Sequence, residues 1–356
     1  MRMTCEAKVY QTGNSFQKLV YRKMADYLDA KGITHFSMSQ GGKLYRHLLP
    51  SDCTVENFLF NQNIYDAAKN RFDEKKAGDW KRAISNTASS QPCCFNLFVP
   101  LQQDLNLASK LLTALSGNPL VVHYIEIEFT PDKLPLENLP DFRVRPDDSK
   151  ESIGDQGNMQ GTDADIAVFY SHGNLKGVIL CEFKYIEDEF SQCTSWKNKS
   201  KDIMRCSNPD FYKHMMEEEM KIGGSLACGY LKYENWSLTI DSEYFDINEI
   251  RSLPGCPFRH SLNQLWRNFL LAEKVKNARG LDECQFWVIS PKENKTLWNN
   301  HKENVVSAFR TTLSKSGNDH FKKFYLEDVC EVLNSCDLSD YQRKWMSAFT
   351  EKYLIT

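Results

Sequence analysis

Two apolar runs joined by a polar turn constrain the fold of this chain most. Residues 165–170 (DIAVFY) precede the stretch SHGNLKG at 171–177, and VILCEFKY follows at 178–185. Runs rich in β-branched and aromatic residues, on either side of a turn that contains Gly and Asn, predict two antiparallel strands in a β-hairpin. In both runs the residues on either face of the strand are apolar, so we expect the sheet that contains them to be covered on both faces.

Three charged residues interrupt this apolar hairpin at one end. Glu182 and Lys184 are two residues apart, so their side chains point to the same face of a strand. Asp165 begins the partner strand, and the hairpin brings it within cross-strand reach of Glu182. A purely structural interpretation is a cross-strand ion pair on a solvated face, but the apolar surroundings argue against it.

These three side chains suit one kind of chemistry. Paired carboxylates such as Asp165 and Glu182 are ligands for a hard cation, Mg²⁺ or Mn²⁺, which retains waters and accepts phosphate oxygens. Lys184 beside them can hold or deprotonate an attacking water, or stabilise the charge that grows on a phosphorane. A metal, a water and a cation are the parts that phosphodiester hydrolysis requires.

Other patterns extend the predicted architecture around the hairpin. We expect a helix over 104–115, a strand over 121–129, a helix over 259–278 and a strand over 285–290. A polar, Pro- and Asp-rich passage over 131–162 is expected to be a loop. This order of elements predicts an α/β sandwich around a mixed sheet.

Charge and hydropathy limit the class of protein. The net charge is −3, from 44 Lys and Arg against 47 Asp and Glu, so no global basic field draws the chain to nucleic acid. The basic stretches 75–82 and 196–201 are interpreted as solvated surface. No window approaches the length of a membrane span, and the first residues have no signal-like apolar core, so we expect a cytoplasmic protein with no membrane partner.

Twelve cysteines are scattered along the chain and are expected to be reduced thiols. Cys93, Cys94 and Cys181 lie in apolar, strand-like runs, where a thiol behaves as a small hydrophobic group. A second set follows the lysine and raises the question of an iron–sulfur cluster or a structural zinc: Cys193, Cys206, Cys228 and Cys256. None of these four forms a Cys-x₂-Cys pair, which disfavours such a site but leaves it open.

Asp165, followed by Glu182-Phe183-Lys184 at the end of a hairpin, resembles the signature of the PD-(D/E)XK nuclease superfamily. The flanking segments CEFKYIE, SSQPCCFNLFVPL and QLWRNFLLAE are similar to a bacterial restriction-endonuclease-like branch of it. The resemblance covers roughly residues 80 to 290. It implies a restriction-endonuclease-like core with a mixed β-sheet flanked by helices over 79–295, between a mainly helical region at 1–78 and a helical region at 296–356.

The resemblance also implies roles for single residues. Asp165 and Glu182 would hold the metal, and Lys184 would assist the nucleophile. The proline that usually precedes the first Asp is missing here, where the sequence is Thr162-Asp163-Ala164-Asp165. Asp163 is therefore a rival metal ligand.

Further candidates come from the neighbouring elements. Glu126 and Glu128 lie in the strand predicted over 121–129 and are expected to point to one face, so either could supply another acidic ligand. On the later helix, Gln264 could orient the lysine or the scissile phosphate, and Arg267 could bind a phosphate. An ordinary polar helix edge explains these two residues equally well.

The expected function is a metal-dependent endonuclease that hydrolyses DNA with Mg²⁺ or Mn²⁺. A role in bacterial defence or DNA processing is implied by the resemblance alone. An RNA nuclease, a nuclease activated by a partner or ligand, and a non-catalytic nucleic-acid-binding module on the same fold are the alternatives. The intact Asp, Glu and Lys argue against the last of these. The expected partner is nucleic acid, with DNA favoured, and a homodimer is left open.

Overall fold

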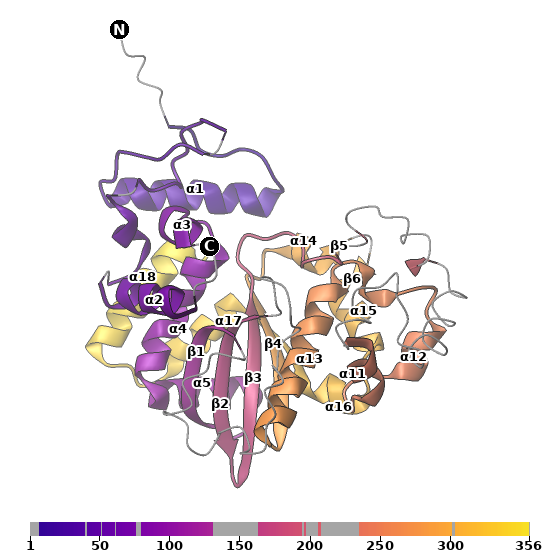
Figure 1. Ribbon diagram of the computed structural model, residues 1–356. Helices are drawn as coiled ribbons and strands as arrows, with labels where there is room; N and C mark the ends of the chain where they lie inside the picture. The colour runs from indigo at the N-terminus through magenta and orange to yellow at the C-terminus, as the bar shows by residue number, and fades with distance from the viewer. Residues whose placement is uncertain are drawn as a thin grey trace.

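In the part of the chain that the structure describes, a five-stranded mixed sheet has helices on both faces (Figure 1). The computed structural model describes residues 7–39, 41–50, 52–60, 62–75, 80–130, 163–193, 196, 206–207, 235–300 and 303–355. The strands lie in the order β1 (Val121–Phe129), β2 (Ala164–His172), β3 (Leu175–Phe183), β4 (Glu283–Ser290) and β7 (Phe321–Tyr325). The pairs β1–β2 and β2–β3 are antiparallel, whereas the pairs β3–β4 and β4–β7 are parallel. This arrangement confirms the predicted α/β class.

The predicted hairpin is present, but its turn is shorter than expected. We predicted a turn over 171–177, whereas β2 continues to His172 and β3 begins at Leu175. Gly173 opens the remaining two-residue turn with a φ of 60°, a conformation that such turns require and that glycine adopts without strain. Ile166 pairs with Cys181, so the next residues along the two strands are Asp165 and Glu182. The tight turn therefore sets the register that brings the two carboxylates together.

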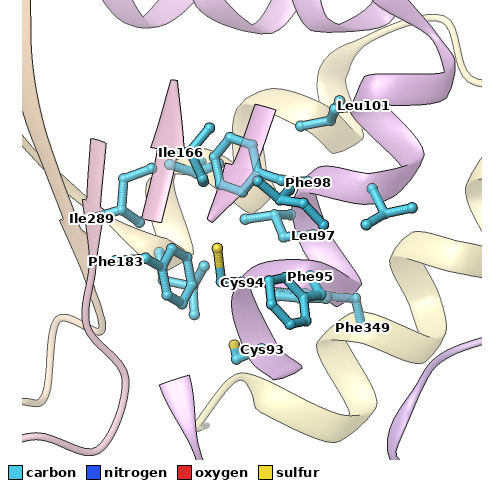
Figure 2. Close-up of a cluster of buried hydrophobic side chains, with 14 of the residues drawn as sticks. Cys93, Cys94, Phe95, Leu97, Phe98, Leu101, Ile166, Phe183, Ile289 and Phe349 are labelled. Carbon is cyan, nitrogen blue, oxygen red and sulfur yellow. The ribbon is translucent and has the colours of Figure 1, made fainter. Parts of the chain in front are cut away.

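One face of the sheet is covered by α4 (Ser90–Gln103), α5 (Leu105–Ser116) and α17 (Leu326–Ser335). Cys93 and Cys94 lie in α4 and not in a strand-like run as predicted, although both are buried as expected (Figure 2). Every residue from Pro92 to Leu101 is buried, because α4 packs against the sheet on one side and other helices on the other. A helix that is apolar all round has no amphipathic period, so its sequence resembles that of a buried strand.

The opposite face is covered mainly by α13 (Leu262–Arg279), which packs on β3 and β4. The remaining described helices are α1 (Ser15–Ala30), α2 (Gln62–Lys75), α3 (Trp80–Ser85), α11 (Asn235–Asp241), α12 (Ile247–Ser252), α14 (Lys295–Trp298), α15 (Val305–Thr311), α16 (Lys315–His320) and α18 (Asp340–Tyr353), with 3₁₀ turns at Thr54–Asn57 and Pro257–Arg259. Two short strands, β5 (Asn299–Asn300) and β6 (Glu303–Asn304), pair separately. No helix in the described part of the chain is long and apolar enough to cross a membrane.

The fifth strand comes from a stretch that we expected to be helical. β7 (FKKFY) lies within 296–356 and pairs with β4 in parallel. The hydrophobic core on the α4 face includes Val20, Phe98 and Trp345, one residue from each of the three predicted regions. The three regions therefore share packing in one core, while the boundaries at 78 and 295 stay a prediction. The predicted loop over 131–162 lies outside the described residues.

Lys352 of α18 is fully buried in the shared core. Its ammonium nitrogen donates to the backbone and side-chain oxygens of Asn57, at 2.5 and 3.0 Å, and the rings of Tyr27 and Tyr353 lie within 5.4 Å. None of these partners carries a negative charge. Burial lowers the pKa of Lys352 from 10.5 to about 7, because a charged amine is poorly solvated there.

This buried amine predicts a pH dependence of stability. Between the folded pKa of about 7 and the unfolded pKa of 10.5, the unfolded chain binds the proton more tightly, so the stability contributed by Lys352 rises with pH across that window. Lys352→Met should remove this contribution. Urea unfolding at about pH 7 and about pH 9 should show the native chain gaining stability relative to the variant at the higher pH. Parallel pH profiles for the two proteins would contradict the lowered pKa.

Candidate active site

A buried carboxylate, Glu182, is the hub of the candidate site. The residue is 3% exposed, and its carboxylate accepts three hydrogen bonds. Oε1 accepts from the amide of Gln264 at 2.7 Å and from the ammonium group of Lys184 at 2.8 Å. Oε2 accepts from the amide of Asn268 at 2.6 Å. A carboxylate this deeply buried keeps its charge only when donors replace its lost hydration, and these three do so.

Two of the donors come from one face of α13. Gln264 was predicted as a site residue, whereas Asn268 was not. The two are four residues apart, so both side chains lie on the same side of the helix, above Glu182. The side-chain oxygen of Gln264 also accepts from the backbone amide of Ser191 at 2.9 Å, which orients its amide nitrogen toward the carboxylate. The i, i+4 spacing from Gln264 was the available signal for Asn268.

Asp165 lies beside Glu182 at the start of β2. Its Oδ2 accepts from the backbone amide of Phe183 at 2.6 Å. Burial raises the pKa of Asp165 well above its ordinary value, and the charges of Glu182 and Glu128 raise it further, against the opposing charge of Lys184. A bound cation would relieve the repulsion between neighbouring carboxylates.

Lys184 extends the same strand edge just beyond β3. Its backbone amide donates to Ile289 at 2.9 Å, so the chain still follows β4 at this point. Burial lowers the pKa of Lys184, but the carboxylates of Glu182, Glu187 and Asp165 outweigh that effect and the net pKa lies above its ordinary value. The side chain is therefore a charged ammonium group within the acidic cluster.

Glu126 and Glu128 do not share a face, contrary to expectation. Glu128 has a φ of 49°, which departs from extended backbone and breaks the alternation on which that expectation rested. Glu126 is buried against Arg71, with a 2.9 Å ion pair, and accepts from the hydroxyl of Tyr124. Glu128 instead accepts from Gln91 of α4 at 2.6 Å. In this arrangement the carboxylate of Glu126 is paired with Arg71, and its role as an acidic ligand stays a prediction.

Glu128, Asp165 and Glu182 form a row across the neighbouring strands β1, β2 and β3. Ile127 pairs with Ile166 and Phe129 with Ala164, so Glu128 lies opposite Asp165, just as Asp165 lies beside Glu182. The predicted rival ligand Asp163 is exposed and precedes β2, and its role stays a prediction. Arg267 is partly buried on α13, and its phosphate-binding role stays a prediction too.

The donor set fits a hard cation in part. Among the residues that the structure describes, no three His, Cys, Asp or Glu side chains are arranged to hold a metal ion by themselves. Mg²⁺, however, often uses only one or two carboxylates and completes its shell with water and phosphate oxygens. Glu182 uses three of the roughly four acceptor positions of a carboxylate, and Asp165 has one described donor, so each retains acceptor capacity.

Two of the later cysteines, Cys206 and Cys256, lie next to each other, and no disulfide bond joins them. The backbone amide of Cys256 donates to the carbonyl of Cys206 at 2.8 Å, and that of Cys193 donates to Arg259 at 3.3 Å. All three are free cysteines, and Cys228 lies outside the described residues, as does most of the basic stretch 196–201. The iron–sulfur or zinc alternative therefore stays untested.

Comparison with known families identifies the chain. The model of the family REase-ARP, described as "Restriction Endonuclease associating with ARP", matches residues 22–354. The chain belongs to the REase-ARP family. This restriction endonuclease family is consistent with the PD-(D/E)XK resemblance, and the match extends beyond the 80–290 span on which that resemblance rested. No curated protein and no solved structure matches this REase-ARP protein.

The Glu182 hydrogen bonds predict unequal effects of two substitutions on stability. Asn268→Ala removes the described donor of Oε2 and should lower the free energy of unfolding by about 1–3 kcal/mol, because a buried charged oxygen loses its partner. Gln264→Ala should cost less, because Oε1 keeps Lys184 and Gln264 is only partly buried. Urea unfolding of both variants measures the difference. An equal or reversed order would contradict the hydrogen-bond assignment.

Proposed function

We propose that this protein is a metal-dependent endonuclease that hydrolyses phosphodiester bonds in DNA. One observation carries the proposal: Asp165 and Glu182 lie side by side on the hairpin, with Lys184 at 2.8 Å from Glu182, in a chain of a restriction endonuclease family. An ordinary surface ion pair does not account for this cluster, because Glu182 and Lys184 are only 3% and 9% exposed. Two side-chain amides also donate hydrogen bonds to Glu182.

Each residue has a distinct proposed role. Asp165 and Glu182 would hold Mg²⁺ or Mn²⁺, and Glu128 would add negative charge next to Asp165 in the row. When bound, the cation would polarise the scissile phosphate and favour a hydroxide nucleophile. Lys184 would neutralise the charge that develops on the phosphoryl oxygens. Gln264 would keep Glu182 in place through its amide.

A cation at the far end of the same row supports the nucleic-acid assignment. Val288 of β4 lies opposite both Glu182 and Lys323, so Lys323 of β7 continues the row on the face that bears Glu182. Its ammonium nitrogen lies 4.2 Å from the centre of the Trp298 ring and donates to the hydroxyl of Tyr325 at 3.1 Å. It is partly exposed and forms no ion pair within the described residues. We propose that Lys323 contacts a DNA phosphate.

The position of this row also favours a substrate site. The acidic residues and Lys323 lie toward the carboxyl ends of the parallel strands β3, β4 and β7, where α14 follows β4 (Figure 1). Ligands of α/β sheets bind outside those strand ends, because the loops there can be varied without disturbing the core. The proposed setting is the bacterial cytoplasm, in defence or DNA processing.

A nuclease activated by a partner is the alternative that the comparison favours. The description of the family names association with ARP. Under this alternative the same residues cut nucleic acid, but the isolated chain is slow until its partner binds. Cleavage assays with the chain alone and with added partner would separate the two cases. RNA in place of DNA as substrate is tested in the same assays.

Lys184→Met tests the chemical role of the lysine. Loss of an electrostatic stabiliser of the transition state should slow DNA cleavage in Mg²⁺ by about 10²–10³-fold, while DNA affinity should change little because it depends on many phosphate contacts. EDTA should abolish cleavage by the native chain. Gel assays and fluorescence anisotropy measure the two quantities. Cleavage at the native rate by the variant would place the active site elsewhere.

Lys323→Gln tests the DNA contact, with Lys322→Gln as its matched control. Lys322 is the neighbouring lysine on β7, also partly buried, and it lies opposite Trp287 of the core on the other face. Loss of one phosphate contact should reduce the slope of log affinity against log salt by about 1 for Lys323→Gln and leave it unchanged for Lys322→Gln. Anisotropy titrations without Mg²⁺ measure both slopes. Equal slopes for the two variants would exclude Lys323 from the interface.

A further inference from the structure

The backbone of β1 is strained at one residue, and that residue lies beside the candidate site. Glu128 has a φ of 49°, in the left-handed region that side chains other than glycine rarely adopt. Such a conformation persists only where the surrounding structure holds it, and strained residues gather at functional sites. Glu128 therefore needs a cause for its conformation within the fold.

Arg71 of α2 supplies that cause. Its guanidinium group donates to the carbonyl oxygen of Ile127 at 2.9 Å and to that of Glu128 at 2.8 Å. In an extended strand, successive carbonyls point to opposite sides, so one group can reach both only if the backbone kinks between them. The two bonds hold the two peptide groups on either side of the Glu128 Cα atom. Arg71 is 4% exposed, so water does not compete for them.

The kink decides where the carboxylate of Glu128 lies. The side chain reaches α4, where Gln91 donates to its Oε1 at 2.6 Å, and the residue lies opposite Asp165 in the row. Glu128 and Asp165 are thus neighbours across the two strands, because Ile127 pairs with Ile166 and Phe129 with Ala164. The departure from extended backbone at Glu128 therefore sets the direction in which this carboxylate leaves the strand.

We propose that Arg71 is a positioning residue, which holds Glu128 beside Asp165 and thereby increases the affinity of the site for a divalent cation. The inference rests on the proposed function, because it concerns the same metal site. It assigns a role at that site to a residue of the N-terminal 78, which lies outside the span of the superfamily signature. The competing view is that Arg71 only covers the open edge of the sheet.

The opposite edge of the sheet offers a matched control for that competing view. Arg310 donates to the carbonyl oxygens of Asn318 and Phe321, at 3.0 and 3.1 Å, beside the other edge strand, β7. It resembles Arg71 in binding two backbone carbonyls but is remote from Glu128 in the sheet order. Arg310→Gln should thus reproduce the structural cost of losing such a residue without any effect on the cation.

The experiment measures Mn²⁺ binding by the rise in thermal unfolding temperature as the metal alone is titrated into the protein. Arg71→Gln should raise the half-saturating Mn²⁺ concentration by about 10-fold or more, as is usual when a residue that supports a metal ligand is lost. Glu128→Gln should have a similar effect. The double variant should be no worse than Glu128→Gln alone, because Arg71 acts through Glu128. Arg310→Gln should lower the unfolding temperature without changing the Mn²⁺ dependence.

Each other outcome has a definite meaning. Native Mn²⁺ dependence in Arg71→Gln, or a further loss of affinity in the double variant, would overturn the positioning role while leaving the proposed function intact. No Mn²⁺ stabilisation of the native chain would overturn the metal site itself. If Arg71→Gln does not fold, Arg71→Lys replaces it, because lysine keeps the charge beside Glu126 but cannot donate to both carbonyls in the same fork. Native Mn²⁺ affinity in that variant would equally overturn the inference.

Discussion

The charge on Glu182 is the constraint around which this half of the molecule is organised. A carboxylate at that depth would be neutral or excluded without donors, and its donors come from Lys184, just beyond β3, and from α13. The helix must therefore cross the sheet at a fixed height and rotation, with its apolar residues Leu265 and Phe269 packed into the core between the polar ones. The same contacts that satisfy the charge thus align a helix on the sheet.

Local periodicity predicted the part of the site that one hairpin contains. The two-residue period of strands placed Glu182 and Lys184 on one face, and the length of the hairpin brought Asp165 beside them. The contribution of α13 was predicted only in part, because Gln264 could be selected by its place on a helix, whereas the relevance of Asn268 depends on how that helix packs. Packing angle and height are not encoded in any short pattern.

Other features could not be predicted for identifiable physical reasons. The segment FKKFY is too short and too charged to stand out as a strand, and β7 forms because β4 offers it an edge. The apolar helix α4 lacks a polar face, so its sequence resembles a buried strand. The kink at Glu128 arises from a residue 57 positions away in the sequence, Arg71, so neither local propensity nor alternation reveals it.

The hairpin turn has a practical consequence for work on this protein. Gly173 and Asn174 form the tip of β2 and β3, at the far end of these strands from Asp165 and Glu182, and Leu175 beside them is 45% exposed. Exposed tips tolerate added chain best, because little packing depends on them. The nine-residue strands on either side separate such an addition from the acidic cluster. A fluorophore or affinity peptide attached there would report on the protein in solution while leaving the opposite rim of the sheet accessible to a long, charged polymer.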